Sequence, residues 1–515
     1  MLAAAYSATL HGLDAFPVRV EVDASRGVPS FDLVGLAEIA VRESRVRVKS
    51  ALAQVGVDLS EYRVLVNLAP ADLRKYGSAF DVAIAVAVLA ALRRVPHEAL
   101  ARTMLLGELS LSGGIHPVRG VLPYTMGARG RRFSRVIVPV ANEAEAALVD
   151  GIDVFVASHL AELARALSGE QELARARPAD AAMAPTSSED LADVRGQMAA
   201  RRALEIAAAG GHNILMIGPP GAGKTMLARR VGGILPPLEP AESLEVMTIH
   251  SVAGLLRGAR QRMVDRPFRA PHHTASDIAL VGGGEPPRPG EVSLAHRGVL
   301  FLDELAEWKR SALEALRQPL EEGTVTVSRA RGTATFYARP MLVAATNPCP
   351  CGFLGDSLRC NCSDPGKRAY RARLSGPLLD RIDVHVVLPP VDPSSIVEIS
   401  RTGEPSAAVR DRVLEARARQ ADRHARGVCS ARYNAVLSAA ELEATMKLDD
   451  AARAVLVRST EKQMMSARAF SKVLRVARTI ADLAGSEPVL AVHAAEAVAL
   501  RAFDRGFEKQ PADAA

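Results

Sequence analysis

The chain has 515 residues, 48% of them hydrophobic and 24% charged, which is the balance of a soluble globular protein with roughly three domains. The longest apolar run, Val82 to Leu92, is about half of the ~20 residues that a membrane span needs, so the sequence predicts no membrane contact. Four of the five cysteines lie in one short segment and the N-terminus lacks a secretory pattern, which excludes a disulfide framework and predicts a cytoplasmic protein. The net charge of +6 permits a nucleic-acid partner but does not predict one.

The first part of the chain, residues 1–166, alternates short β-branched runs with helical patterns. Val64–Leu68 is one such run, and Asp81–Leu92 is one such helix. The pattern predicts an α+β or α/β domain with its own core. Residues 167–190 are rich in Ala, Glu, Pro and Ser and poor in large apolar side chains, which predicts a solvated linker.

Strands and helices alternate again in residues 191–390, which predicts a second α/β unit. Residues 391–507 are almost purely helical in pattern, and residues 508–515 are expected to form a frayed tail. The fold class that we predict is therefore a multidomain α/β protein with a helical C-terminal part.

A glycine-rich loop follows an apolar strand at Asn213–Ile217 and precedes a helical pattern that begins at Met226. The spacing is GxxxxGK[ST], whose glycines let backbone N–H groups surround phosphates. Lys224 is expected to contact the β and γ phosphates of ATP, and the Thr225 hydroxyl to bind Mg²⁺. A chance lysine after a glycine-rich turn is the weaker alternative in this context. The predicted ATP-binding residues are Gly218, Pro219, Pro220, Gly221, Ala222, Gly223, Lys224 and Thr225.

Two further apolar strands end in polar side chains that suit nucleotide hydrolysis. Gly298–Leu302 ends in Asp303, which fits the Mg²⁺-binding position, and Glu304, which would orient or deprotonate the attacking water. Met341–Thr346 ends in Asn347, which is placed to sense the γ-phosphate. Solvated caps for the acids and an Asx turn for the asparagine are the alternatives. Together these groups predict an ATP hydrolase.

The order of these strands resembles that of AAA+ ATPases, and longer stretches resemble the magnesium-chelatase-like YifB/ComM family over nearly the whole chain. These stretches are Arg269–Ser276, Gly282–Gly284, Pro289–His296 and Leu374–Asp383. The resemblance implies a Lon-protease-like (α+β) N-terminal domain (1–166), an AAA+ P-loop core (191–390) and a C-terminal helical lid (391–507). It also implies that Asp190–Gln197 lies against the adenine.

The same resemblance implies roles for three arginines. Arg381 matches the arginine finger that completes the site of a neighbouring subunit, which implies a homo-oligomeric, hexameric ring. An ion pair with Asp380 or Asp383 is the alternative for Arg381. Arg468 resembles the sensor-2 arginine, and Arg475 is the second choice for that role.

The Lon-like part departs from the protease pattern at two positions. Ala79 occupies the place of the nucleophilic serine, and Leu122 stands where the base lysine belongs. Ser78 is one position away, but without a base it is a poor nucleophile. We therefore predict a proteolytically inactive domain that serves assembly or DNA contact.

Four cysteines follow Asn347 in a CxC-x8-CxC pattern: Cys349, Cys351, Cys360 and Cys362. Their number matches a closed structural zinc site, although CxC is tighter than the usual CxxC. Free or redox-active thiols and an iron–sulfur cluster are the alternatives. Cys429 stands alone and is interpreted as a buried residue.

An arginine-bearing hairpin is predicted at Thr324–Arg339, where two alternating strands flank a turn. In helicase-like AAA+ proteins this position projects into the central pore. The resemblance therefore implies that Arg329 and Arg331 contact DNA phosphates, and intersubunit ion pairs are the alternative. Further candidates for the same channel are Arg269, His272 and His273.

The function that the resemblance implies is DNA translocation or remodelling driven by ATP, as a ring-forming branch-migration helicase in homologous recombination and natural transformation. Its partner would be branched or single-stranded DNA, and its cofactors ATP and Mg²⁺, with Zn²⁺ at the cysteines. The main alternative is a magnesium-chelatase-type motor that remodels a protein partner. A protease is opposed by Ala79 and Leu122, and a non-enzymatic scaffold by the complete set of ATPase groups.

Overall fold

The computed structural model describes residues 1–36, 38–131, 133–177, 189–256, 261–329, 332–374, 376–391 and 403–501. Eight strands of the N-terminal part form a mixed sheet in the order β10-β9-β8-β5-β1-β2-β4-β3. They are β1 (Leu2–His11), β2 (Asp14–Arg26), β3 (Ser30–Val34), β4 (Tyr62–Ala69), β5 (Thr103–Leu105), β8 (Arg135–Pro139), β9 (Asp153–Ala157) and β10 (Ala174–Arg175). A small separate pair consists of β6 (Glu108–Leu109) and β7 (Ile115–His116).

Helices cover both faces of this sheet because alternate strand residues are apolar on each side. Ile137 packs into the cluster that contains α2, whereas its neighbours Val136 and Val138 pack into the cluster that contains α3. Every residue of α2 is buried. The helices are α1 (Ile39–Gln54), α2 (Asp81–Ala91), α3 (Val121–Arg129), α4 (Glu143–Ala146) and α5 (Leu160–Leu167). The α/β organisation predicted for this part of the chain is confirmed.

Strand β10 lies inside the segment predicted to be a linker. It pairs antiparallel with β9, with Ala174 opposite Val156 and Arg175 opposite Phe155. The composition of this segment did not indicate a strand, because the two residues of β10 are exposed and carry no apolar alternation. The rest of the predicted linker, 178–188, lies outside the described residues.

A five-stranded parallel sheet forms the middle of the molecule, in the order β12-β15-β18-β11-β19. Its strands are β11 (Ile214–Ile217), β12 (Phe268–Arg269), β15 (Val299–Leu302), β18 (Met341–Thr346) and β19 (Val384–Val387). Their apolar residues are buried on both faces, as expected for a parallel sheet between helices. Because β11 has later strands on both sides, the sheet has a switch point there, where ligands bind at the carboxyl ends of strands.

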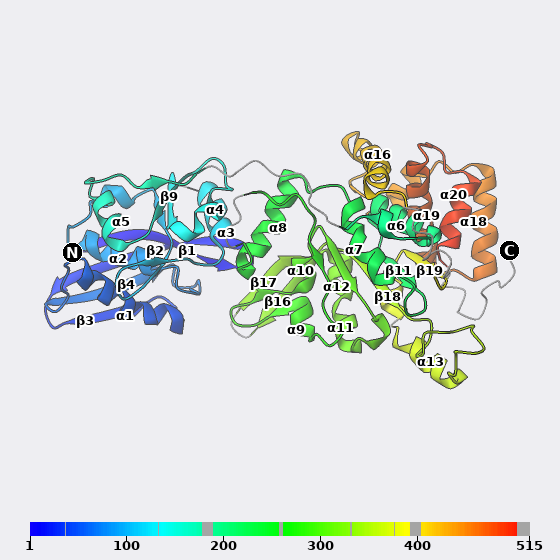
Figure 1. Ribbon diagram of the computed structural model, residues 1–515. Helices are drawn as coiled ribbons and strands as arrows, with labels where there is room; N and C mark the ends of the chain where they lie inside the picture. Colours follow the sequence, from blue (N-terminus) through cyan, green and yellow to red (C-terminus); the bar gives the residue numbers. More distant parts are fainter. Residues whose placement is uncertain are drawn as a thin grey trace.

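Helices surround this sheet, and a two-stranded hairpin stands beside it (Figure 1). The helices are α6 (Met198–Gly210), α7 (Lys224–Ile234), α8 (Pro240–Ala253), α9 (Asp277–Val281), α10 (Glu291–Leu294), α11 (Arg310–Ala315), α12 (Arg317–Glu322), α13 (Asp364–Arg373) and α14 (Gly376–Leu379). The hairpin consists of β16 (Thr324–Arg329) and β17 (Gly332–Tyr337), and a short pair consists of β13 (Gly282–Gly283) and β14 (Arg288–Pro289). The hairpin predicted from alternation is confirmed.

Helix α8 joins the N-terminal domain to the middle one. Leu122 and Leu148 of the N-terminal domain share a small hydrophobic cluster with Met247 and Leu256. The Ser251 hydroxyl donates to the carboxylate of Glu145 at the same contact. The two domains therefore meet through buried side chains, and Figure 1 shows α8 between them.

The C-terminal part is helical, as predicted, and packs on the middle domain. Its helices are α16 (Ser406–Ala425), α17 (Ala439–Thr445), α18 (Asp450–Gln463), α19 (Ala467–Leu483) and α20 (Ala491–Ala499). Val413 of α16 and Val473 of α19 lie in one hydrophobic cluster with Ile206 of α6 and Ile214 of β11. Among the helices described, none combines the length and the apolar character needed to cross a membrane.

Candidate nucleotide-binding site

The glycine-rich loop connects β11 to α7 at the switch point of the parallel sheet. Gly221 (φ +79°) and Gly223 (φ +86°) adopt left-handed backbone conformations that favour glycine. The helix begins at Lys224, two residues earlier than the predicted Met226, so both Lys224 and Thr225 lie on its first turn. The N–H groups of this first turn and the positive end of the helix dipole therefore lie at the end of the loop, as an anion site requires.

Lys224 connects the loop to the end of the neighbouring strand. Its Nζ donates to the carbonyl oxygens of Gly218 (2.6 Å) and Pro219 (3.0 Å) and to Oδ1 of Asn347 (3.0 Å). Burial lowers the pKa of Lys224, and the carboxylates of Asp303 and Glu304 act in the opposite direction. The structure thus brings together the lysine and the asparagine that the sequence predicted for phosphate contact.

Thr225 and Asp303 also meet. The Thr225 hydroxyl donates to Oδ2 of Asp303 over 2.7 Å, although the two residues follow different strands. Trp308 Nε1 donates to the carbonyl oxygen of Asp303 (2.9 Å), which holds the end of β15 in place. A hydroxyl and a carboxylate side by side are hard oxygen ligands, and this donor set fits Mg²⁺ bound together with phosphate oxygens.

Glu304 has an unusual backbone and an unexpected partner. Its φ is +50°, a left-handed conformation that is costly for a residue other than glycine. Nδ1 of His273 lies 3.0 Å from its Oε2, and the rings of His273 and His272 lie 4.2 Å apart. The sequence placed His273 in a pore-lining segment, whereas the structure places it against the predicted catalytic carboxylate.

Arg269 also has a partner within this chain. It donates to both carboxylate oxygens of Glu291, over 2.6 and 2.7 Å. Bidentate pairs of this kind are strong and directional. The guanidinium group is thus held beside α10, where the sequence had suggested a channel contact.

The predicted arginine finger, Arg381, forms an ion pair with Glu321 of α12. Of the two partners that the sequence offered as the alternative, Asp383 pairs with Lys472. The hydrogen bond from Arg381 lowers the pKa of Glu321, and the positive charge of Arg468 adds to this effect. Glu321 therefore marks a place where both predicted arginines come close.

Arg475 has a different environment. Its Nε donates to the carbonyl oxygen of Leu437 over 2.9 Å, inside the helical C-terminal part. The charge of Arg468, in contrast, acts on Glu321, the ion-pair partner of Arg381.

The stretch Asp190–Gln197 lies beside the phosphate loop. Gln197 Nε2 donates to the carbonyl oxygens of Ala222 (3.2 Å) and Pro389 (2.9 Å). Asp190 Oδ1 accepts from the backbone N–H of Ser406, the first residue of α16. The stretch thus bridges the loop, the end of the sheet and the helical part.

Family models cover most of the chain. The model described as "Magnesium chelatase, subunit ChlI" matches residues 190–396, "Subunit ChlI of Mg-chelatase" matches residues 20–142, and "Magnesium chelatase, subunit ChlI C-terminal" matches residues 403–501. YifB of Escherichia coli is 42% identical over 497 residues, which cover 96% of each chain. The competence protein ComM of Haemophilus influenzae is 41% identical over 515 residues, which cover 99% of each chain.

The chain belongs to the YifB/ComM family of magnesium-chelatase-like AAA+ ATPases. An uncharacterized protein of Mycobacterium tuberculosis is 46% identical over 486 residues, covering 94% of this chain and 95% of the relative. Two shorter similarities are weaker. Lon protease 2 of Bacillus subtilis is 26% identical over 162 residues, and the DNA repair protein RadA of Treponema pallidum is 38% identical over 90 residues.

At the two positions where the N-terminal domain departs from the Lon pattern, the structure has buried apolar side chains. Ala79 and Leu122 are both buried, and Leu122 lies in the cluster against α8. The Ser78 hydroxyl donates to the carboxylate of Glu108. Lys75 is buried, and its Nζ donates to the carbonyl oxygen of Pro70. The described side chains at this place thus show no serine–lysine hydrogen bond.

The hairpin β16–β17 packs one face into the core and exposes the other. Val327 and Phe336 are buried, and the β1–β2 turn of the N-terminal domain lies against β17. A Cβ on Gly12 would lie 2.8 Å from the carbonyl oxygen of Thr335, and Leu13 packs against the same hydrophobic cluster. The Arg329 side chain and the whole of Arg331, the predicted DNA contacts, lie outside the described residues.

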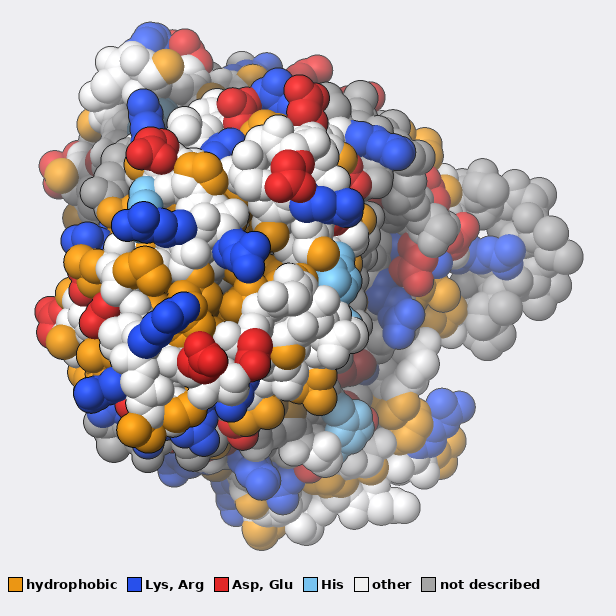
Figure 2. Space-filling view, turned by 90° about the vertical axis from the view of Figure 1, so that its left-hand side faces the viewer, with side chains coloured by type: hydrophobic (Ala, Val, Ile, Leu, Met, Phe, Trp, Pro, Cys, Tyr) orange, Lys and Arg blue, Asp and Glu red, His pale blue; other side chains and the backbone are white. Residues whose placement is uncertain are grey.

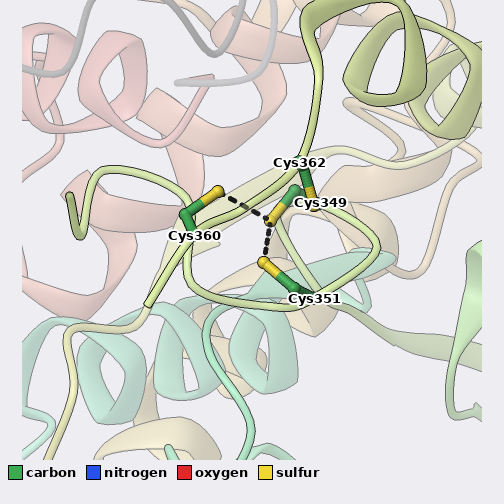
Figure 3. A group of neighbouring side chains, drawn as sticks. All are labelled: Cys349, Cys351, Cys360 and Cys362. Carbon is green, nitrogen blue, oxygen red and sulfur yellow. Dashed lines mark hydrogen bonds between the residues drawn. The ribbon is translucent and has the colours of Figure 1, made fainter. Parts of the chain in front are cut away.

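The cysteines predicted as metal ligands are brought together between β18 and α13 (Figure 3). Their four sulfur atoms lie within 4.8 Å of one another, and Cys349 is buried while the other three are half-buried. Cys429 lies apart from them in a small cluster with Leu437 and Leu442, as its interpretation as a buried residue predicted. The donor set of four thiols fits a tetrahedral structural metal site.

Proposed function

We propose that this chain is an ATPase that uses hydrolysis to translocate on or remodel DNA, as a ring-forming branch-migration helicase in homologous recombination and natural transformation. The relationship that supports ATP hydrolysis is the meeting of three strand ends at the switch point. Lys224 contacts Asn347, and Thr225 contacts Asp303, so the phosphate-binding, metal-binding and sensing groups occupy one edge of the sheet.

Each group has a specific part in this proposal. Lys224 binds the β and γ phosphates and Thr225 with Asp303 binds Mg²⁺, which neutralises charge on the phosphates. Glu304 orients the attacking water and accepts its proton, and Asn347 senses the γ-phosphate. Gly221, Gly223 and the first turn of α7 supply backbone N–H donors, since Pro219 and Pro220 have none.

A ring is the second part of the proposal. Arg381 acts on the nucleotide of a neighbouring subunit, and Arg468 senses the nucleotide, in a homo-oligomer that we propose is hexameric. The proximity of both arginines to Glu321 supports a common location near a subunit boundary. In the isolated chain Arg381 is ion-paired with Glu321. Assembly must therefore replace this ion pair with a contact between Arg381 and the phosphate of the neighbouring subunit's nucleotide.

DNA is the substrate that we propose for the motor. Support comes from the relatives, one of which is named as a competence protein and another as a DNA repair protein. Arg329 and Arg331 at the hairpin tip are the proposed phosphate contacts. Figure 2 shows positive, negative and hydrophobic side chains mixed on the end of the molecule formed by the N-terminal domain.

The alternative is a magnesium-chelatase-type motor that remodels a protein partner. It is favoured by the three family models, whose descriptions all name a subunit of magnesium chelatase. In that case the hairpin arginines would contact an acidic polypeptide.

The cofactors that we propose are ATP with Mg²⁺ at the nucleotide site and Zn²⁺ at the four cysteines. We propose the cytoplasm as the site of action, because ATP is available there and the five cysteines are free thiols. The proposed domains are an inactive Lon-like domain (1–166), the AAA+ core (191–390) and the helical lid (391–507).

The direct experiment incubates purified protein with a labelled four-way DNA junction and ATP and follows conversion of the junction to duplex products. Conversion by the wild type and none by Lys224→Ala is the expected result. If the wild type hydrolyses ATP but never converts the junction, the DNA motor is excluded and the protein-remodelling alternative is favoured.

A further inference from the structure

The four cysteines form a cage with the dimensions of a metal–thiolate site. Sγ of Cys349 lies 3.4 Å from Sγ of Cys351 and 3.9 Å from Sγ of Cys360 (Figure 3). In a tetrahedral zinc site with Zn–S bonds of about 2.3 Å, neighbouring sulfur atoms are about 3.8 Å apart. A disulfide would need about 2.05 Å, and all four thiols are free.

Little else in the described structure closes this loop. The segment between β18 and α13 has no helix or strand, and the Leu358 side chain is 91% exposed. Its internal hydrogen bonds are local, such as those from Gly352 N to Cys349 O and from Cys360 N to Asp356 O. A loop without a hydrophobic core of its own gains its fixed shape from the metal when ligands from both ends converge on one ion.

The closed loop lies directly against the phosphate loop. Gly352 has a left-handed φ of +85°, and a Cβ at this position would lie 2.4 Å from Cδ of Pro220. Asn347, the partner of Lys224, precedes Cys349 by two residues. The cage therefore fixes one wall of the phosphate loop and the strand end that carries Asn347.

We propose that Cys349, Cys351, Cys360 and Cys362 bind one zinc ion, and that this ion controls ATP affinity by holding the Gly352 segment against Pro220. This inference rests on the proposed ATP site. The metal has no open coordination position when four thiolates bind it, so its role is positional. Loss of the metal would release the loop and weaken nucleotide binding.

The first test measures the metal content of purified full-length protein and the affinity for a fluorescent ATP analogue. We expect about one zinc per chain. Displacing the zinc with a mercurial thiol reagent should lower nucleotide affinity about tenfold, and Cys360→Ser/Cys362→Ser should lose both metal and affinity. Cys429→Ser is the matched control, since this buried thiol is outside the cage, and it should retain both.

A second variant separates the loop contact from folding. Gly352→Ala should keep its zinc but lower ATP-analogue affinity about tenfold, because the methyl group would collide with Pro220. Gly355→Ala is its control: it has a similar left-handed φ of +91° but no neighbouring atom within 4 Å, so its affinity should stay close to that of the wild type.

The possible outcomes test three separate claims: the zinc site, its coupling to ATP affinity, and the ATP site itself. Absence of zinc, or iron with sulfide in its place, would overturn the zinc site. Full zinc with an unchanged affinity after metal removal and in Gly352→Ala would overturn the coupling. A wild type that contains zinc but binds no ATP would refute the proposed ATPase while leaving the metal site intact.

Discussion

Nδ1 of His273 lies 3.0 Å from Oε2 of Glu304, the carboxylate that we assign to the attacking water. This contact engages the catalytic oxygen with a side chain from the segment after β12. We expect His273→Ala to release Glu304 and raise the basal ATPase rate several-fold. The ratio of the DNA-stimulated rate to the basal rate should fall. Steady-state ATPase measurements would show both changes.

The control for this variant is His272→Ala, because His272 contacts Thr274 over 2.8 Å and lies beside the His273 ring without a described bond to Glu304. It should have a smaller effect on the basal rate. A lower kcat in His273→Ala with unchanged KM would show instead that the histidine holds Glu304 in its active position.

Replacing Glu304 itself should separate binding from hydrolysis. Glu304→Gln keeps the size of the side chain but removes the base, so kcat should fall about 10²–10⁴-fold with nucleotide affinity retained. Lys224→Ala should lose nucleotide affinity itself. Equal losses of affinity in both variants, measured with a fluorescent ATP analogue, would argue against a role for Glu304 as the base.

Arg381 should act across a subunit boundary. Arg381→Ala is expected to lower kcat about 10³–10⁵-fold. Mixing it with Lys224→Ala subunits should restore part of the activity, since each mixed boundary can combine an intact site with an intact arginine. If no mixing ratio restores activity, the shared site is wrong and the ion pair with Glu321 is the function of Arg381.

A buried ion pair joins the sheet to the helical lid. Lys472 Nζ lies 2.9 Å from Oδ1 of Asp383, and both side chains are about nine-tenths buried. Burial alone would raise the pKa of Asp383, but the charge of Lys472 and hydrogen bonds hold it well below its usual value. Burial lowers the pKa of Lys472 despite its partner. The short contact, with a further hydrogen bond from Asn213 N to Asp383, favours a charged pair.

Lys472→Met should therefore destabilise the protein by about 3–5 kcal/mol at pH 7, because it removes the lysine partner of a buried carboxylate. The depressed pKa of Asp383 contributes stability above the pKa of an unfolded aspartate, and this contribution is lost as the pH falls. The difference between the two proteins should thus shrink toward pH 4, where the variant's Asp383 takes up a proton.

Thermal unfolding at both pH values measures this difference. Lys447→Met, which breaks the exposed pair with Glu487, is the control and should cost less than about 1 kcal/mol. A Lys472→Met protein with the same unfolding temperature as the wild type at pH 7 would contradict the account of this pair.

Local sequence spacing predicted the elements of the nucleotide site, because one short loop and three apolar strand ends carry its groups. It predicted the hairpin for the same reason, since alternation has a period of two. Contacts between distant segments could not be predicted in this way. His273 and Glu304 are separated by 30 intervening positions, and Arg381 and Glu321 by 59, so only the folded chain shows that they pair.

In the N-terminal domain, too, contacts between distant segments could not be predicted from sequence. The substitutions at Ala79 and Leu122 predicted the loss of protease chemistry from sequence alone. That Leu122 packs against α8 of the next domain depends on tertiary structure, because an apolar residue in a helix pattern indicates burial but not its partner. Strand β10 was missed because it is short and exposed.

The measurement that tests the central claim most directly is the ATPase rate with and without a four-way DNA junction. It compares the wild type, Arg329→Ala/Arg331→Ala and the control Arg453→Ala/Arg458→Ala, which removes the same charge from exposed positions of α18. We expect DNA to stimulate the wild type and the control, and the hairpin variant to keep its basal rate but lose the response. Equal rates with and without DNA in the wild type would contradict the DNA motor.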